Sequence, residues 1–441
     1  MDDTSKHCES RRTWFLGAIR TSIVTSLLFL LVYPTCNWIT SLRTDVGTWY
    51  YAWERYIPFV PIMIIPYMSI DLFFVAAPFL CRDCQERRVY AWRMTLAILT
   101  AGMFFLVMPL KLAVPRPEAT GWLGELFSQF LAMDKPYNLC PSMHIALRTI
   151  LADLYARHSR GMLLRVLSDV WFSLIGFSTL LTHQHHVVDV IGGFMLAFVC
   201  MYLVRQTPLI QPVLPNRRVG SYYAVGAIAL SAIAVWLGGW GLWLLWPAFS
   251  FGLVAAAYFW LGPGVYRKSA GVIPRTAKLI HAPVLFGQWL SLLYYRRQCR
   301  AWDKVTEKLW IGRVLTNREA KVAVEEGVTA VLDLTAEFSE AKPFFGVDYC
   351  NVPILDLTAP TVEQLEKATE FIRRASQVGV VYVHCKVGYS RSAAVVGEYL
   401  LSEGLCKNVE EVVKLLRGIR PTIVIRPEVR ELLKRTSSTN A

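Results

Sequence analysis

Long apolar segments alternate with short polar ones over the first 262 residues, and the pattern then changes. A helix needs about 20 mostly apolar residues to cross a bilayer. We predict a multi-pass helical membrane domain, in which six spans form a core and two further spans follow. The fourth span is the weakest, because Arg148 and Asp153 interrupt it. The eight predicted spans are 14–33, 57–80, 94–114, 142–155, 164–181, 187–204, 222–238 and 242–261.

From residue 304 onward, short apolar runs alternate with amphipathic segments. Such alternation is typical of a soluble α/β domain, which we place at 304–435. Its predicted strands are 309–311, 330–334 and 380–384, and its predicted helices are 320–326, 362–377, 392–403 and 409–417. The remaining divisions are a tail at 1–13, the membrane core at 14–206, two added spans at 207–262, a linker at 263–303 and a tail at 436–441.

Composition and charge agree with a membrane protein. The chain is 54% hydrophobic and only 18% charged, whereas soluble domains carry about 25% charged residues. Its net charge is +13, and most basic residues flank apolar segments in every other loop, which places both termini in the cytoplasm. No cluster of basic and aromatic residues indicates nucleic-acid binding. We expect a plasma or inner membrane location, with an interfacial helix at 279–295.

One segment of the α/β domain carries most of its chemistry. Residues 381–392 predict an apolar strand, a tight loop and a helix. Backbone N–H groups converge where such a loop meets a helix N-terminus, and this creates an anion site. Cys385 opens the loop, where a positive environment favours its thiolate. Arg391 closes the loop and can clamp two phosphate oxygens.

Three neighbouring residues support a phosphate site there. Gly388 permits a tight backbone path, His384 can hydrogen-bond to the loop, and Ser392 can donate to the thiolate. The sequence therefore predicts a cysteine nucleophile that attacks a phosphate ester.

This pattern, His-Cys-x5-Arg-Ser, resembles the dual-specificity branch of the protein tyrosine phosphatases. The resemblance covers the α/β domain, where 309–312, 331–335 and 418–421 match landmarks of that family in order. It implies a general acid on a loop before the cysteine. Asp356 fits that position, and its rival Asp333 lies inside a predicted strand, where we expect a structural role.

The resemblance leaves the substrate class open between phosphoproteins and lipids. Lys386 directly follows the nucleophile, as in relatives that act on acidic phospholipid headgroups. A second basic loop residue of those relatives is absent, since Tyr389 stands in that region. Membrane tethering also favours a lipid phosphate monoester.

The membrane domain has its own polar patches, at 111–117, 140–144 and 178–189, all at non-cytoplasmic span ends. Polar residues at membrane depth are costly and mark function by default. Asp189 lies four residues after His185, so the two share a helix face. A histidine can attack phosphate and another can protonate a leaving group. The alternatives for His183, His185 and His186 are a zinc cluster or plain interfacial histidines.

These patches resemble the type 2 phosphatidic acid phosphatase superfamily. The Pro-Ser-x-His motif matches fully, but Lys111 lies two residues too close to Arg116. Thr179 replaces the usual arginine, as in the branch similar to inositol phosphorylceramide and sphingomyelin synthases, which transfer headgroups. The resemblance implies His185 as nucleophile, Asp189 as its partner, His144 as a further catalytic residue, and a phosphate-binding role for Lys111, Arg116, Ser142 and Ser178.

Together these features predict a fusion of a histidine-dependent lipid phosphatase or phosphotransferase with a cytosolic cysteine phosphatase. Its partners would be phospholipid or phosphoprotein substrates and membrane lipids. One alternative is a protein phosphatase anchored by a degenerate membrane domain, and another is a non-enzymatic phospholipid-binding scaffold. We expect no cofactor and no metal, because the pair Cys81 and Cys84 lacks further ligands.

Overall fold

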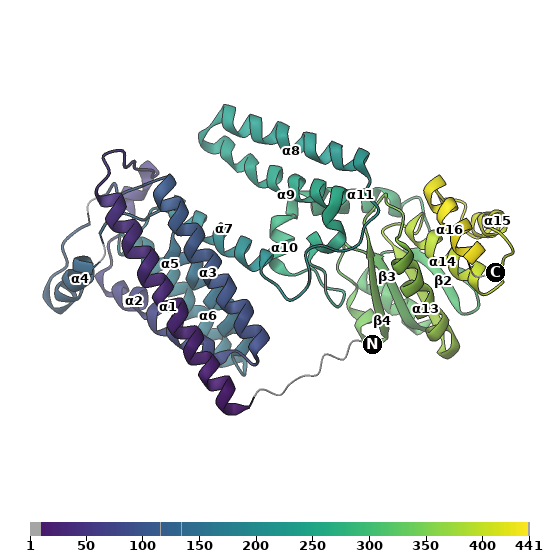
Figure 1. Cartoon of the computed structure of the whole chain (residues 1–441), viewed down its shortest axis with the longest axis horizontal. Coiled ribbons are helices and arrows are strands. Elements are labelled where there is room, and N and C mark those ends of the chain that lie inside the picture. The colour runs from purple at the N-terminus through teal and green to yellow at the C-terminus, as the bar shows by residue number, and fades with distance from the viewer. Residues whose placement is uncertain (1–9, 115, 134, 440–441) are drawn as a thin grey trace. The chain divides into compact units, whose positions relative to one another are not determined.

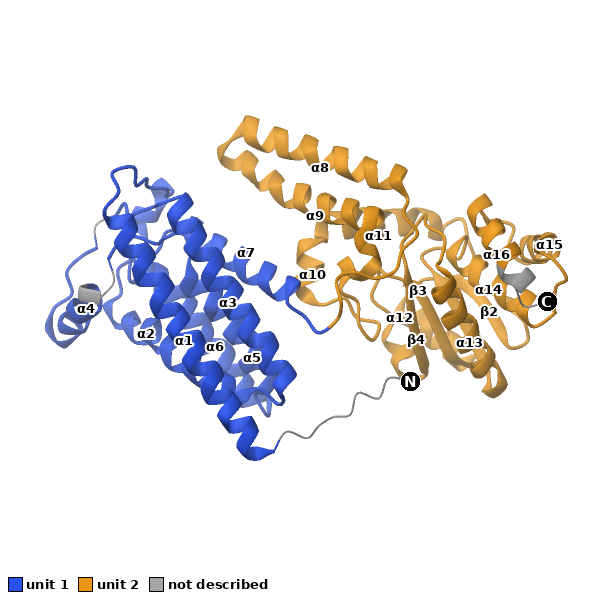
Figure 2. Cartoon of the chain, viewed as in Figure 1, with its two compact units in different colours: residues 1–206 blue, residues 207–441 orange. Residues whose placement is uncertain are grey.

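The computed structural model describes residues 10–114, 116–133 and 135–439. It divides into two compact units, Met1–Gln206 and Thr207–Ala441, which Figure 2 draws in blue and orange. Most of the predicted tail 1–13 and the last two residues of the tail 436–441 lie outside the described residues. The two units are described in turn.

The first unit is a helical bundle (Figure 1). Its centre is α5, whose buried Met143, Ile150 and Leu154 pack into one core with residues of the surrounding helices. Because other helices cover most of α5, this helix exposes little surface to lipid. The helices of this unit are α1 (Arg11–Ser41), α2 (Ile64–Ala76), α3 (Cys84–Val107), α4 (Gly121–Met133), α5 (Met143–His158), α6 (Met162–Leu181) and α7 (Val187–Leu203), with short 3₁₀ turns η1 (Ala52–Tyr56), η2 (Pro61–Met63) and η3 (Ala77–Leu80).

Among the described residues, six helical segments are long and apolar enough to cross a membrane. The chain is therefore a membrane protein with a helical N-terminal region, as predicted. α7 is apolar but shorter, and α5 has 16 residues, so their crossing of the membrane stays a prediction. The six segments are Arg11–Ser41, Pro61–Leu80, Cys84–Val107, Met162–Leu181, Arg217–Leu237 and Gly239–Tyr266.

The predicted bounds of the third span were wrong. The structure starts this helix at Cys84, ten residues before the predicted start, because the Asp83 side chain caps it by accepting from the Glu86 backbone N–H at 2.7 Å. The helix ends at Val107, because Met108 precedes Pro109 and a proline disfavours helical backbone in the residue before it. Helix α4 was not predicted.

The second unit begins with a helical hairpin, defined here as residues 217–266. α8 (Arg217–Leu237) and α9 (Leu245–Ala256) lie side by side (Figure 1), joined by η4 (Gly239–Leu244) and followed by η5 (Ala257–Leu261) and η6 (Gly262–Tyr266). From Val225 onward the exposed side chains of α8 are apolar, which suits lipid contact. They include Val225, Ile228, Val235 and Trp236.

The predicted linker helix 279–295 is two helices. α10 (Arg275–Ile280) ends before His281, and α11 (Ala282–Arg296) follows with Pro283 in its first turn. Proline suits a helix start but cannot continue an existing helix, because it has no N–H to donate. The break therefore falls where the sequence places Pro283.

A five-stranded sheet forms the centre of the α/β domain, in the order β1-β2-β5-β3-β4. β1 is antiparallel to β2, and the other neighbours are parallel. Its strands are β1 (Trp302–Thr306), β2 (Leu309–Arg313), β3 (Val328–Thr335), β4 (Asp348–Ile354) and β5 (Val380–Cys385), and its helices are α12 (Asn317–Glu325), η7 (Lys342–Gly346), α13 (Val362–Val378), α14 (Arg391–Ser402), α15 (Val409–Ile419) and α16 (Pro427–Thr439).

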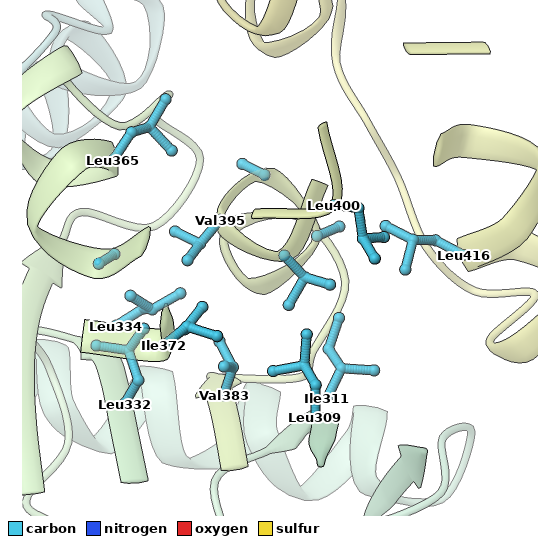
Figure 3. Packing of buried hydrophobic residues seen from close by; sticks show 14 of the residues in the cluster. Leu309, Ile311, Leu332, Leu334, Leu365, Ile372, Val383, Val395, Leu400 and Leu416 are labelled. Carbon is cyan, nitrogen blue, oxygen red and sulfur yellow. The ribbon is translucent and has the colours of Figure 1, made fainter. Parts of the chain in front are cut away.

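Successive side chains of β5 pack on opposite faces of the sheet, and both faces are buried. Val381 and Val383 join the larger core, which Figure 3 shows, whereas Tyr382 joins the core on the opposite face. Successive strand side chains point to opposite faces, so this apolar run packs in both directions. The strand thereby delivers Cys385, its last residue, to the edge of the larger core.

Candidate active sites

The cysteine site lies where β5 ends and α14 begins. Cys385 is the last residue of the strand and Arg391 the first of the helix, so the loop between them, here called the phosphate loop, connects the two elements. Cys385 is 2% exposed. The next residue is tied to the end of β2, since the Val314 N–H donates to the Lys386 carbonyl at 3.2 Å.

Arg391 is held by a partner that sequence reasoning missed. Its guanidinium donates to both oxygens of the buried Glu337 carboxylate, at 2.7 and 3.1 Å, and to the Ile354 carbonyl at 2.8 Å. This fork-to-fork geometry fixes the plane of the guanidinium. The arginine is thereby held in one orientation at the start of α14, where an anion would bind.

Two features shape the phosphate loop from outside. Gly388 has φ +73°, and a Cβ there would lie 2.5 Å from the Gly312 carbonyl oxygen, so only glycine fits. Arg420 donates to the Val387 carbonyl at 2.9 Å and pairs with Asp303 at 2.6 Å. A charged partner thus anchors the loop to the start of β1.

His384 belongs to a buried ionic cluster behind the loop. Its Nε2 lies 2.7 Å from Glu340 Oε2. Burial lowers the pKa of His384, but Glu340 and Asp333 outweigh burial, and the net shift is upward. The ligand atoms of Asp333, Glu340 and His384 lie within 4.8 Å of one another, close enough to hold a metal. However, the Lys268 ammonium contacts Asp333 and Thr335 and supplies the positive charge inside this cluster.

Asp356 and Asp333 have different environments. Asp356 follows β4, and its carboxylate lies 3.3 Å from the Arg391 guanidinium and 3.5 Å from the Lys386 ammonium. Asp333 is completely buried and accepts hydrogen bonds from Tyr349 at 2.7 Å and from the Thr335 backbone at 2.8 Å. The structure brings Asp356, not Asp333, next to the arginine that closes the phosphate loop.

The charges of the site favour a thiolate. Burial raises the pKa of the Cys385 thiol, but the charge of Arg391 and the backbone N–H of Ser392 outweigh it, so the pKa is lowered. Burial also raises the pKa of Asp356, and the charges of Arg391 and Lys386 again reverse the direction. Without substrate, both groups are therefore biased toward their anionic forms, and both anions are held by one arginine.

The second site lies in the helical bundle, where His144 and His185 line one cavity of about 290 Å³. His144 stacks on Tyr67 with ring centroids 4.1 Å apart. Asp189 Oδ2 lies 3.6 Å from His185 Nδ1. The cavity also carries apolar side chains, which suits an acyl chain more than a polar ligand. Its lining includes Phe29, Leu30, Tyr33, Met68, Phe74, Phe130 and Leu147.

Buried hydrogen bonds hold the three polar patches together. The Ser142 backbone N–H donates to the Asp189 carbonyl at 2.9 Å, and the Ser142 hydroxyl accepts from the Ile145 N–H at 3.2 Å as the cap of α5. Arg116 donates to the carbonyls of Thr182 and His183 at 3.1 and 3.2 Å. These contacts join residues from the first, second and third patches.

Other predicted residues lie differently. The Lys111 side chain is exposed and does not line the cavity. The Ser178 hydroxyl donates to the Ile175 carbonyl at 2.7 Å, within its own helix. His186 pairs with Glu54 at 3.1 Å, a carboxylate that sequence reasoning missed. Because His186 pairs with a carboxylate and His183 contacts the Ile57 carbonyl at 3.1 Å, the three histidines do not converge as metal ligands would.

Comparison with known families identifies two domains in this chain. Residues 309–437 match the dual specificity phosphatase catalytic domain, and residues 40–203 match the PAP2 superfamily. The chain joins these two domains, and through residues 309–437 it belongs to the dual-specificity phosphatases. It is therefore a phosphoric monoester hydrolase.

Several relatives of the dual-specificity phosphatase domain are known. Human phosphatidylglycerophosphatase and protein-tyrosine phosphatase 1 is 33% identical over 170 residues, which cover 35% of this chain and 84% of that protein. Phosphatidylglycerophosphate phosphatase PTPMT2 of Arabidopsis thaliana is 29% identical over 147 residues, covering 32% of this chain and 64% of that protein. The crystal structure of PTPMT1 matches with 26% sequence identity and a TM-score of 0.29. The match covers 32% of this chain and 95% of that chain.

The dual-specificity phosphatase domain also uses residues from outside the matched range. Lys386 donates to the Gln288 side-chain carbonyl at 2.7 Å, and Gln288 belongs to α11. Lys268, before β1, reaches the cluster of Asp333. No motif marks Glu337, Glu340, Gln288 or Lys268, so the sequence offered no signal by which to find them.

Proposed function

We propose that this chain is a membrane-bound bifunctional phosphatase whose cysteine site hydrolyses a phosphate monoester on a phospholipid headgroup. One observation carries the proposal. The Lys386 cation follows the nucleophile and is almost completely buried between Asp356 and Gln288, which belongs to a helix next to the membrane hairpin. The names of the human and Arabidopsis relatives point to the same substrate class, since both include a phosphatidylglycerophosphate-type activity.

The proposed reaction proceeds in two balanced steps. The Cys385 thiolate attacks phosphorus, the bond to the headgroup oxygen breaks, and Asp356 gives that oxygen its proton. Arg391 binds two phosphate oxygens throughout. Water then attacks the cysteinyl phosphate, Asp356 takes a proton from the water, and inorganic phosphate leaves with the thiolate restored. Phosphate oxygens between Arg391 and Asp356 would offset the charge that lowers the pKa of Asp356, and so favour the protonated acid.

The histidine site would act on the opposite membrane face. The basic loops between spans support this orientation, in which His144 and His185 would lie at non-cytoplasmic ends and the C-terminal domain would lie in the cytoplasm. A reducing compartment also suits an ionised cysteine. Hydrolysis and headgroup transfer would share one phosphoenzyme at His185. They would differ only in the acceptor, which is water in the first and a lipid in the second. A cysteine introduced after Arg300 should resist a membrane-impermeant thiol reagent in intact cells, and reaction there would contradict this orientation.

The substrate class is tested on the full chain carrying His185→Ala, which leaves the cysteine site as the source of activity. We expect kcat/KM to be higher for phosphatidylglycerophosphate in mixed micelles than for a phosphotyrosyl peptide. A higher value for the peptide would favour the alternative, a protein phosphatase anchored in the membrane. Activity toward neither substrate would contradict both and favour a scaffold.

The identity of the general acid can be tested separately. Asp356→Asn should lower kcat for a lipid phosphate by about 10²–10⁴-fold, the usual contribution of a general acid. The loss should be smaller for an aryl phosphate, whose leaving group needs no proton. The comparison variant is Asp333→Asn, which should lower the melting temperature because Asp333 pairs with buried Lys268. If only Asp333→Asn showed the leaving-group dependence, Asp356 would not be the acid.

A further inference from the structure

Helix α11 lies against the phosphate loop with one face. Its residues Val284, Gln288, Leu292 and Tyr295 recur at helical spacing, so they share that face. Val284 packs into a buried cluster that also contains Leu355 and hairpin residues. Gln288 contacts Lys386, and Tyr295 packs edge-on against Tyr389 with ring centroids 6.1 Å apart.

The opposite face of α11 is apolar and exposed. Its side chains Phe286, Trp289, Leu290 and Leu293 are between 37% and 59% exposed. The helix follows a hairpin long and apolar enough to cross a bilayer. An exposed apolar face so close to a spanning hairpin suits the membrane interface. The helix therefore presents lipid on one side and the phosphate loop on the other.

The hairpin also reaches the loop that carries the general acid. The Tyr258 hydroxyl donates to the Asp356 carbonyl at 2.9 Å. Asn216, the cap of α8, donates to the Leu357 carbonyl at 2.8 Å. Tyr223 of α8 stacks on Tyr258, with ring centroids 5.9 Å apart. Membrane elements outside the family match of 309–437 thus contact both catalytic loops.

Gln288 lies on the side of the site from which a leaving group departs. Asp356 protonates the leaving oxygen in the proposed reaction, and Lys386 contacts both Asp356 and Gln288. A glutamine amide has two N–H donors and two acceptor lone pairs. The contact with Lys386 occupies one lone pair of the amide oxygen, so an N–H donor and the second lone pair can serve a ligand. Gln288 is half-buried, so a headgroup can reach it.

We propose that Gln288 is a specificity-determining residue of the cysteine site, which with Lys386 binds the hydroxyl groups of a polyol headgroup beside the phosphate. This rests on the proposed lipid phosphatase function. The substrate would be a phospholipid with a terminal phosphate on a glycerol-like headgroup. Its acyl chains would stay in the bilayer beside the apolar face of α11, while the phosphate reaches Cys385. The Gln288 amide would thereby replace the second basic residue of the phosphate loop, which is absent here because Tyr389 stands in that region.

The test compares two substrates on the full chain carrying His185→Ala. Gln288→Ala should lower the ratio of kcat/KM for phosphatidylglycerophosphate to kcat/KM for para-nitrophenyl phosphate by about tenfold, since a tenfold change corresponds to about 1.4 kcal/mol, close to one hydrogen bond. The aryl phosphate has no polyol and makes no such contact. Gln298→Ala is the matched control, because Gln298 follows the same helix and its side chain is exposed.

An unchanged ratio would overturn the role of Gln288, even if both values fell together, because an effect through folding would affect both substrates. A ratio that fell equally in Gln298→Ala would overturn it as well. Lack of aryl phosphatase activity in the parent chain would instead contradict the proposed function itself. The two failures are therefore distinguishable.

Discussion

Replacement of Cys385 by serine is expected to abolish hydrolysis at the cysteine site, with a loss on the order of 10⁴-fold or more. The charge of Arg391 and the Ser392 backbone N–H lower the pKa of the thiol, but a serine hydroxyl is far too weak an acid for the same environment to ionise. The variant would keep the phosphate-binding groups and lose the nucleophile. The measurement is phosphate release from para-nitrophenyl phosphate by the full chain carrying His185→Ala, without added metal and with vanadate as inhibitor.

Two controls separate chemistry from folding. Cys406 is also a buried cysteine of the larger core, and it lies after α14 rather than in the phosphate loop. Cys406→Ser should retain activity, and both variants should show similar far-ultraviolet circular dichroism. Turnover that remained undiminished in Cys385→Ser would exclude Cys385 as the nucleophile.

The second large effect is expected in the membrane domain. His185→Ala should abolish covalent labelling of the protein by phosphatidic acid carrying radioactive phosphate, in a chain that already contains Cys385→Ser. His185 lines the cavity, and Asp189 lies 3.6 Å from its Nδ1, where it can stabilise the positive charge that develops on the ring. The label should be stable to alkali and labile to acid, as expected for phosphorylhistidine.

The neighbouring His183→Ala is the matched variant, because the His183 ring contacts the Ile57 carbonyl and does not line the cavity that His144 and His185 share. It should keep the label. Labelling that survived His185→Ala but disappeared in His183→Ala would move the nucleophile to His183. Labelling in neither the parent chain nor the variants would indicate a membrane domain that only anchors the enzyme.

The proposed arrangement gives the two sites different lipid pools. The cysteine site would meet headgroups of the cytoplasmic leaflet, and the histidine site those of the opposite leaflet. A single lipid would have to cross the bilayer to reach both. A helix such as α11, with lipid on one face and the phosphate loop on the other, would let the cysteine site act on headgroups without extracting the lipid.

The sequence by itself determined those features that depend on neighbouring residues. Cys385 and Arg391 stand six positions apart, so a strand, a loop and a helix start suffice to bring them together. Spans such as α6 and α8 follow from local hydropathy, because a bilayer selects helices by length and apolar content. The apolar run along β5 likewise predicted a buried strand.

Only the tertiary structure decided the partners that complete the sites. Glu337 and Arg391 are 54 residues apart, and Gln288 and Lys386 are 98 apart. No local pattern marks such pairs, because they depend on which loops a sheet and its helices bring to one edge. The same holds for α5, whose half-buried Asp153 pairs at 3.4 Å with Arg93 of α3, 60 residues away. A hydropathy profile counts the charge of Asp153 as unfavourable in a membrane helix, whereas in the folded bundle Arg93 neutralises that charge.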